Sequence, residues 1–266
     1  MDRLSASRVG ALVFVVLLAL FNRAATADEL TDALVRYALG DYARAIALLT
    51  PLAERGDAVA QLKLGLAYAR GEGLPRDTAV GLRWLTRAAE QGQPEAMFEL
   101  GVPYRDGLGT PANGKQAMYW LQRAAERGVP HANNVIGELY LGHADVPQDY
   151  AAALAWFLRG AQLDDADSLY NIAVRYALGQ GVVQDEVEAY KWFDLAANAG
   201  PGDVRSKAVR ARQAIGERLM PLQVREAKIA AQVWLRTHRS ASASPKMPQG
   251  SSPASDTALL RHEHVP

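Results

Sequence analysis

Apolar side chains recur along most of this chain at spacings of three and four residues, the period of an amphipathic helix. Leu64, Gly65 and Tyr68 share one face of a predicted helix over residues 58–70. A turn rich in glycine follows. The next helix carries a stripe at i, i+3, i+4, i+7 and i+8, formed by Gly81, Trp84, Leu85, Ala88 and Ala89. The pattern therefore predicts a hairpin of two helices.

The hairpin recurs every 36 residues without an insertion or deletion. Gly65, Gly101 and Gly137 keep this step, and Ala173 takes the same position in the fourth copy. The aromatic positions keep it too: Tyr68, Tyr104, Tyr140, Tyr176, Trp84, Trp120, Trp156 and Trp192. A single hairpin cannot bury its apolar face alone, so a fixed period of this length is typical of stacked repeats. The sequence predicts an all-α fold, a right-handed α-solenoid of stacked helix hairpins.

Several positions of the repeat have predictable structural roles. Glycine inside a helix costs about 1 kcal/mol relative to alanine, so its recurrence at position 65 and its equivalents indicates a close helix crossing. The tryptophans are expected to be large apolar anchors between hairpins. Pro103 falls inside a first helix and is expected to kink it. Residues suited to an N-cap precede each second helix: Asp77, Asn113, Asp149 and Asp185.

These residues resemble a known repeat. The pattern that carries the resemblance is Gly65-x-x-Tyr68, Gly71-x-Gly73, Pro75-x-Asp77, Trp84, Ala88-Ala89 and Gly92. It is similar to the Sel1-like repeat, a relative of the tetratricopeptide repeat with a longer turn between its helices. Four copies in phase resemble an exported bacterial protein of this type. The resemblance implies an adaptor or scaffold rather than a catalyst, of a kind often found in bacterial envelopes.

Residues 1–27 have the features of a secretory signal peptide. Two arginines precede an apolar run over residues 9–21, which is too short to span a bilayer comfortably. Small residues then form a predicted cleavage site after Ala27, so the mature chain is expected to begin at Asp28. The protein is therefore expected to be periplasmic or secreted. The alternative is an uncleaved segment, which would be its only contact with a membrane.

The flanks of the array predict three further segments. Residues 28–57 read as a capping hairpin similar to a tetratricopeptide repeat, placed before the four Sel1-like repeats over residues 58–200. Residues 201–238 predict a basic helical cap, in which Trp234 folds back on the last repeat. Residues 239–266 are rich in Ser, Ala and Pro and are expected to be a disordered tail.

Charge is unevenly distributed, although the formal net charge of the 266 residues is +0. Residues 28–204 hold 15 Lys and Arg against 24 Asp and Glu, whereas residues 205–239 hold 9 against 2. A solvated acidic surface with a basic cap explains this, and a dedicated partner site is the alternative. The chain has no cysteine, which excludes disulfides, thiolate nucleophiles and cysteine-ligated metals.

Catalytic and metal-binding motifs are not evident in the sequence. His143 and Asp145 replace two turn glycines and read as a polar turn, because two ligands are too few for a metal site. Asp164 and Asp165 are expected to be solvated in a turn between repeats. Residues 262–264, His-Glu-His, read as tail. No cofactor, metal or nucleic acid is expected.

Helical phase places two rungs of residues on the inner helices, where we expect a partner to bind. The rungs are Leu62, Phe98, Asn134 and Tyr170, and Leu66, Val102, Glu138 and Val174. Their aromatic, apolar and amide character suits a peptide or an extended protein segment. The alternative is that some of these side chains pack against the neighbouring inner helix.

Three functional hypotheses follow. The first is a non-catalytic protein–protein interaction scaffold in the cell envelope, which binds a peptide or protein segment on the concave face. The second is an envelope enzyme that acts on cell-wall glycans or peptides. The third is a module that docks on a cell-wall or other anionic surface through Arg205, Arg210, Arg212 and Arg225.

Overall fold

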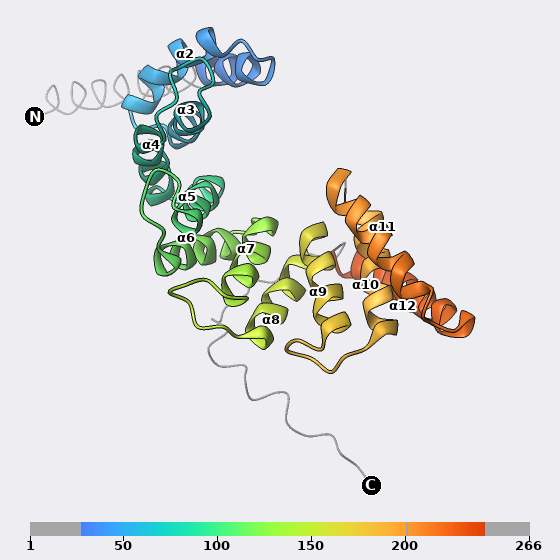
Figure 1. Ribbon diagram of the computed structural model, residues 1–266. Coiled ribbons are helices and arrows are strands. Elements are labelled where there is room, and N and C mark those ends of the chain that lie inside the picture. Colours follow the sequence, from blue (N-terminus) through green and yellow to red (C-terminus); the bar gives the residue numbers. More distant parts are fainter. Residues whose placement is uncertain (1–27, 201, 243–266) are drawn as a thin grey trace, which may run out of the picture.

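The computed structural model describes residues 28–200 and 202–242, in which helices follow one another along an arc (Figure 1). A helix over residues 28–38 comes first. The others are α2 (Tyr42–Glu54), α3 (Ala58–Arg70), α4 (Thr78–Glu90), α5 (Pro94–Asp106), α6 (Gly114–Glu126), α7 (Pro130–Tyr140), α8 (Tyr150–Ala161), α9 (Ala166–Leu178), α10 (Glu186–Ala199), α11 (Gly202–Gly216) and α12 (Pro221–Ser242). The predicted all-α solenoid is confirmed.

Two expected segments fall largely outside this range. The expected signal peptide, with its cleavage after Ala27, lies outside the described residues, and so do residues 243–266 of the expected tail. In the part that the structure does describe, no helix has both the length and the apolar character needed to cross a membrane.

Consecutive helices pack as hairpins, and each hairpin stacks on the next. The pairs within hairpins are α3 with α4, α5 with α6, α7 with α8, and α9 with α10. The second helix of one hairpin then packs on the first helix of the next, and both α11 and α12 pack on α10. First helices lie on the inner side of the arc and second helices on the outer side (Figure 1).

Side-chain caps start the second helices where the sequence predicts them. The carboxylate or amide oxygen of each cap accepts a backbone N–H from the first turn, at 2.8–3.0 Å, which satisfies an otherwise unpaired donor. The four caps are confirmed as Asp77, Asn113, Asp149 and Asp185. Helix α12 lacks a Ser or Thr cap, and Gln223 Oε1 accepts the Met220 N–H at 2.9 Å instead.

The glycine inside each of three first helices marks a close helix crossing, as predicted. A Cβ added at Gly65 would lie 2.9 Å from Leu85 Cγ and 3.0 Å from the Gly81 carbonyl oxygen. At Gly101 it would lie 2.6 Å from Leu121 Cγ. These distances are too short for an ordinary contact, so the two backbones approach this closely only because the side chain is absent.

Each tryptophan of the repeat joins a core cluster, as expected for an apolar anchor. Trp120 and Trp192 are buried, while Trp84 and Trp156 are half-buried and pack against core residues. An arginine three residues later covers each half-buried indole, with Arg87 4.6 Å and Arg159 4.7 Å from the ring centroid. The arginines thus shield the outer edge of the core while their charge stays near water.

The C-terminal helices cover the end of the array. Trp234 of α12 meets Trp192 at 5.6 Å between ring centroids, which confirms that it folds back on the last repeat. His238 stacks on Trp234, and its Nε2 lies 3.3 Å from a carboxylate oxygen of Asp164. Helix α12 continues to Ser242, four residues into the segment that was expected to be disordered tail.

Substitution of Gly101 by alanine tests the close crossing. Alanine favours a helix by about 1 kcal/mol over glycine. The added Cβ meets the fully buried Leu121, however, and overpacking typically costs about 1–3 kcal/mol. We expect Gly101→Ala to lower the urea concentration at which helical circular dichroism is lost.

The matched control is Ala173→Gly, the same repeat position in the fourth copy. Alanine already fits there and is fully buried, so its removal loses the helix preference without relieving a clash. We expect both variants to be destabilised. A Gly101→Ala protein that is more stable than the wild type would show that the crossing does not require glycine.

Candidate functional site

The inner face of the array is formed by the first helices α3, α5, α7 and α9 (Figure 1). Three of the eight residues expected to bind a partner there are buried: Leu62 at 4%, Leu66 at 7% and Asn134 at 7% exposure. For these three, packing within the array accounts for most of the side-chain surface. The other five are partly exposed: Phe98, Val102, Glu138, Tyr170 and Val174.

An apolar cavity of about 420 Å³ brings three of the eight residues together. Leu66 of α3 lines one side, and Phe98 and Val102 of α5 line the other. Leu82, Leu85 and Val135 add further apolar surface. Charged side chains also contribute to its wall, namely Arg70, Arg76, Glu99 and Arg105.

Pro103 lies in the same wall. Helix α5 continues past it to Asp106, and the N–H of Gly107 bonds the Pro103 carbonyl at 2.8 Å. Helix α3 ends in the same way, with the N–H of Gly71 on the Ala67 carbonyl at 2.8 Å. The proline therefore does not shorten this helix, although its missing N–H removes the one hydrogen bond that residue 103 would donate to the Glu99 carbonyl.

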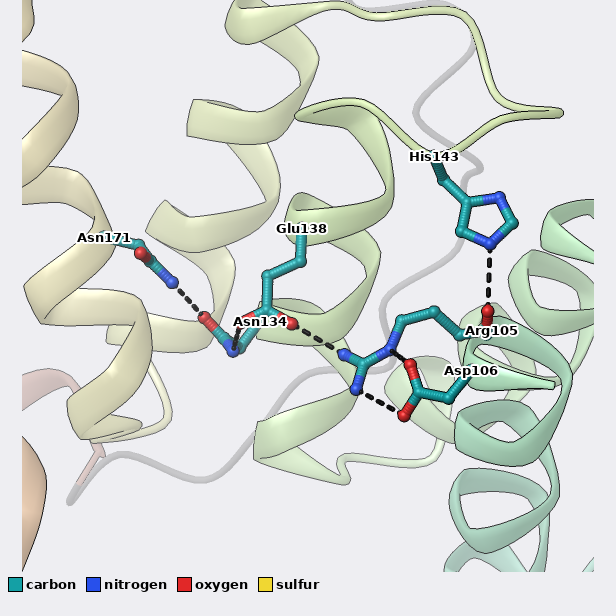
Figure 2. A network of polar contacts seen from close by, with 6 residues as sticks. All are labelled: Arg105, Asp106, Asn134, Glu138, His143 and Asn171. Atoms are coloured by element: carbon teal, nitrogen blue, oxygen red, sulfur yellow. Dashed lines mark hydrogen bonds and ion pairs between the residues drawn. The ribbon is translucent and has the colours of Figure 1, made fainter. Parts of the chain in front are cut away.

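A network of polar contacts runs along the inner face from α5 to α9 (Figure 2). Arg105 Nη1 donates to Glu138 Oε2 at 2.7 Å, and Asn134 Nδ2 donates to Glu138 Oε1 at 3.0 Å. Asn171 Nδ2 donates to Asn134 Oδ1 at 2.8 Å. Arg105 also pairs with Asp106 at 2.6 Å. Three first helices are thus linked by side chains along the groove, the inner face formed by α3, α5, α7 and α9.

Two carboxylates of this face are partly removed from water. Burial raises the pKa of Glu138, although Arg105 and the amide of Asn134 hold it down. Burial also raises the pKa of Glu99, against the charges of Arg70 and Lys63. Arg70 lies 3.4 Å from the Glu99 carboxylate, at the edge of hydrogen-bond range. The electrostatics of the groove favour a partner that brings cationic or N–H groups to these carboxylates.

The turn of the third repeat is polar, and its two unusual residues make structural contacts. In three other hairpins the equivalent of Asp145 is a glycine pressed against the residue that starts the preceding second helix: Gly73 on Tyr42, Gly109 on Thr78 and Gly181 on Tyr150. Asp145 instead accepts the backbone N–H of Gly114, the residue at that position, at 2.9 Å. His143 Nε2 lies 3.0 Å from the Arg105 carbonyl oxygen.

The sequence missed one group of chemically versatile residues at the junction of α7 and α9. His131, Asp165 and Asp167 each present one atom, and these atoms lie within 4.8 Å of one another. The expectation that Asp165 is solvated is wrong, since only 3% of it is exposed. It is buried because its carboxylate caps α9 beneath the start of α7. A signal was present: residues 131 and 167 hold the same repeat position in adjacent copies.

The basic C-terminal segment uses part of its charge internally. Arg212 pairs with Asp194, and Arg218 lies 2.6 Å from Glu186. Arg205, Arg210 and Arg225 are exposed, as is Lys228. Helix α12 also exposes three apolar side chains at helical spacing, Leu222, Ile229 and Val233, at 63%, 50% and 50% exposure.

Comparisons with known proteins agree with the repeat pattern. A family model described as Sel1 repeat matches residues 58–93, 94–129, 130–165 and 166–201. The structure of a Sel1 repeat protein from Oxalobacter formigenes is similar, with 29% identity and a TM-score of 0.65 over 81% of this chain and 88% of that one. The protective antigen c5321 of uropathogenic Escherichia coli, which displays an SLR fold, has 22% identity and a TM-score of 0.48, over 85% of this chain and 58% of that one.

No curated protein matches the chain. The four family matches follow one another without a gap and cover more than half of the 266 residues, in the same register as the caps and glycines described above. This chain belongs to the Sel1 repeat family.

Proposed function

We propose that this protein is a non-catalytic scaffold of the cell envelope, which holds an extended segment of a partner protein on its inner face. Sel1 repeat proteins are generally protein-interaction scaffolds, which supports this class of function. The observation that carries the proposal is the position of the apolar cavity beside the polar network, since Arg105 belongs to both.

The two features suit different parts of one bound segment. The cavity between Leu66 and Val102 is large enough for an aliphatic or aromatic side chain, which would act as an anchor. The amide of Asn171 is partly exposed and offers polar groups to a peptide backbone, while the buried Asn134 holds it in place by accepting from its Nδ2. Glu99 and Glu138 favour basic residues near the anchor, because their carboxylates are partly desolvated.

Export is part of the proposal. The apolar run over residues 9–21 and the small residues before Asp28 favour a signal peptide, and hence a periplasmic or secreted scaffold. The absence of cysteine gives the chain no thiols to be oxidised in such a compartment. The hypothesis of an envelope enzyme gains no support from the side-chain contacts of the described residues.

A second candidate function, docking on an anionic surface, rests on the exposed side of α12. An apolar stripe of Leu222, Ile229 and Val233 lies beside Arg225 and Lys228. Apolar and basic side chains in this arrangement are typical of helices that lie on anionic membrane surfaces. Of the four arginines expected as contacts, Arg212 is engaged with Asp194, so Arg205, Arg210 and Arg225 remain.

Selected peptides test the scaffold proposal. A display library of random peptides is selected on the wild-type chain, and affinities are measured by isothermal titration calorimetry. We expect Phe98→Ala combined with Val102→Ala to weaken binding by roughly tenfold or more, because truncating an anchor pocket costs more than about 1 kcal/mol. The control is Tyr119→Ala, which removes an aromatic side chain that is 47% exposed on the outer helix α6. Equal affinity for the wild type and a folded groove variant would contradict the proposal.

Glu99 gives a prediction about stability. The pKa of Glu99 is raised in the folded protein, so folding favours its protonated form. The resulting contribution to the free energy of unfolding is complete below the pKa of Glu99 in the unfolded chain, and it is lost as the pH rises through the pKa in the folded protein. Replacement by the neutral, isosteric glutamine is therefore expected to increase the free energy of unfolding at neutral pH. This difference should shrink on acidification to about pH 4, the ordinary range of a glutamate.

Urea unfolding of Glu99→Gln at both pH values measures the effect. Glu95→Gln is the control, because Glu95 is exposed in the first turn of the same helix, where a negative charge is favourable. We expect this control to be neutral or slightly destabilised at neutral pH. A loss of stability in Glu99→Gln would show that its contact with Arg70 outweighs its desolvation.

Vesicle binding tests the second candidate. We expect the full chain to sediment with vesicles of phosphatidylcholine and phosphatidylglycerol, and to be released by salt, since exposed charges are screened. Arg225→Glu combined with Lys228→Glu should abolish the association. Binding that persists at high salt, or in this variant, would exclude electrostatic docking through α12.

A further inference from the structure

The stacking of equivalent positions brings three possible metal ligands together at one junction of the array. His131 and Asp167 are each the second residue of a first helix, α7 and α9, and lie 36 positions apart. Asp165 is the N-cap of α9. Nitrogen or oxygen atoms of the three side chains all lie within 4.8 Å of one another.

The other junctions of the array lack this combination. The residues equivalent to His131 and Asp165 are Glu95 and Val129 in the preceding repeat. At the junction before this one, Glu95 and His131 take the places of His131 and Asp167. The residue that takes the place of Asp165 there is Val129, which has an apolar side chain. The combination of one imidazole and two carboxylates is thus not a requirement of the repeat, because adjacent copies stack without it.

The Asp165 carboxylate has one satisfied and one unsatisfied oxygen. Its Oδ2 accepts the Ser168 N–H at 2.9 Å and the Ser168 hydroxyl at 2.5 Å, which completes the helix cap. Its Oδ1 is buried without a hydrogen bond, and the side chain is 0% exposed. Oδ1 faces His131 Nδ1 at 2.5 Å, but without hydrogen-bond geometry. The imidazole is an ion-pair partner of this oxygen only when it is protonated, so a metal cation at this point would stabilise the buried carboxylate when the imidazole is neutral.

The surrounding charges leave the junction electronegative. Asp165 and Asp167 bring two carboxylates to this point, and Asp203 adds a third negative charge near Asp167. Lys207 is a nearby cation. Lys207 is itself paired with Asp203 at 2.7 Å. Two neighbouring carboxylates therefore face one imidazole, which is neutral when it acts as a metal ligand.

We propose that His131, Asp165 and Asp167 form a site for a divalent transition-metal ion, for which Zn²⁺ is the probe. An imidazole nitrogen with two carboxylate oxygens is a ligand set that zinc accepts, and three protein ligands leave a position open for water or another ligand. The side chain of His131 is 64% exposed, so its ring has room to turn. It must do so, because ligand bonds of about 2.0–2.1 Å hold two atoms of a tetrahedral site farther apart than the present Nδ1–Oδ1 distance.

The site lies at the edge of the groove, beside Phe98, whose ring centroid is 6.4 Å from that of His131. The proposal does not depend on peptide binding, because all three ligands come from this chain. An ion at this point would link the start of α7 to the start of α9 and would hold the third and fourth repeats together at their inner edge.

Calorimetric titration of the full chain with Zn²⁺ at neutral pH tests the site. His262 and His264 form a separate His-x-His pair, so the titration is made on the wild type and on His262→Ala combined with His264→Ala. We expect the latter protein to retain one equivalent of bound Zn²⁺. In that background His131→Ala and Asp167→Asn should each weaken binding by roughly tenfold or more.

Two further variants separate ligation from folding. Asp165→Asn keeps a good N-cap side chain but removes the charge, so it should preserve the circular dichroism spectrum and weaken Zn²⁺ binding. Asp145→Asn, in the polar turn of the third repeat, should leave the affinity unchanged. Loss of all Zn²⁺ binding in the variant without His262 and His264 would overturn the proposal. Unchanged affinity in His131→Ala would overturn it equally.

Discussion

The contact between the glycine of each first helix and its partner helix is the constraint on which the rest of the array depends. Gly65 lies against the Gly81 carbonyl and Leu85, and Gly101 lies against Leu121 at the same position. Because the crossing is the same in successive hairpins, each presents the same faces to its neighbours, and hairpins of identical shape can stack without strain. Ala173 shows that the fourth copy tolerates one methyl group at this position, whereas a Cβ added at Gly137 would clash with the Phe157 ring.

Because few positions determine how the hairpins stack, the residues on the inner face can differ from one copy to the next. At the position where Leu62 is buried, later copies carry Phe98, Asn134 and Tyr170, and none of these changes disturbs the caps or the crossings. The inner face is therefore divided by chemistry. Its apolar cavity lies between the first two repeats, and the network of Arg105 and Glu138 begins at the second repeat and extends to the fourth. One continuous surface thus offers different contacts along its length, because stacked repeats form an extended concave face.

The sequence predicted the features that recur in every repeat and those that depend only on neighbouring residues. The period alone gave the helices and the stacked fold, and a cap such as Asp77 depends only on the next three residues. Side-chain burial on the inner face was less predictable, because it depends on how far each hairpin rotates against the next. Leu66 and Asn134 are buried for this reason. Arg175 is a further case: it stands where the other copies have Ala67, Pro103 and Leu139, and it is only 7% exposed, with its guanidinium 5.8 Å from the centroid of the Tyr150 ring.

Departures from the repeat coincide with contacts that the repeat itself does not make. Asp164 has a φ of +58°, where other copies use glycine, a conformation that costs an ordinary residue about 1 kcal/mol or more. It is also the residue that meets His238 of α12, which no internal repeat has as a neighbour. Asp145 replaces a glycine and accepts the N–H of Gly114 in the preceding hairpin, and Pro103 lies in the wall of the cavity. Positions that break the pattern therefore indicate where a copy makes a contact that the other copies do not make. His131 and Asp167 hold one repeat position in adjacent copies, and together with Asp165 they form a cluster that the preceding junction, with Glu95, Val129 and His131, does not form.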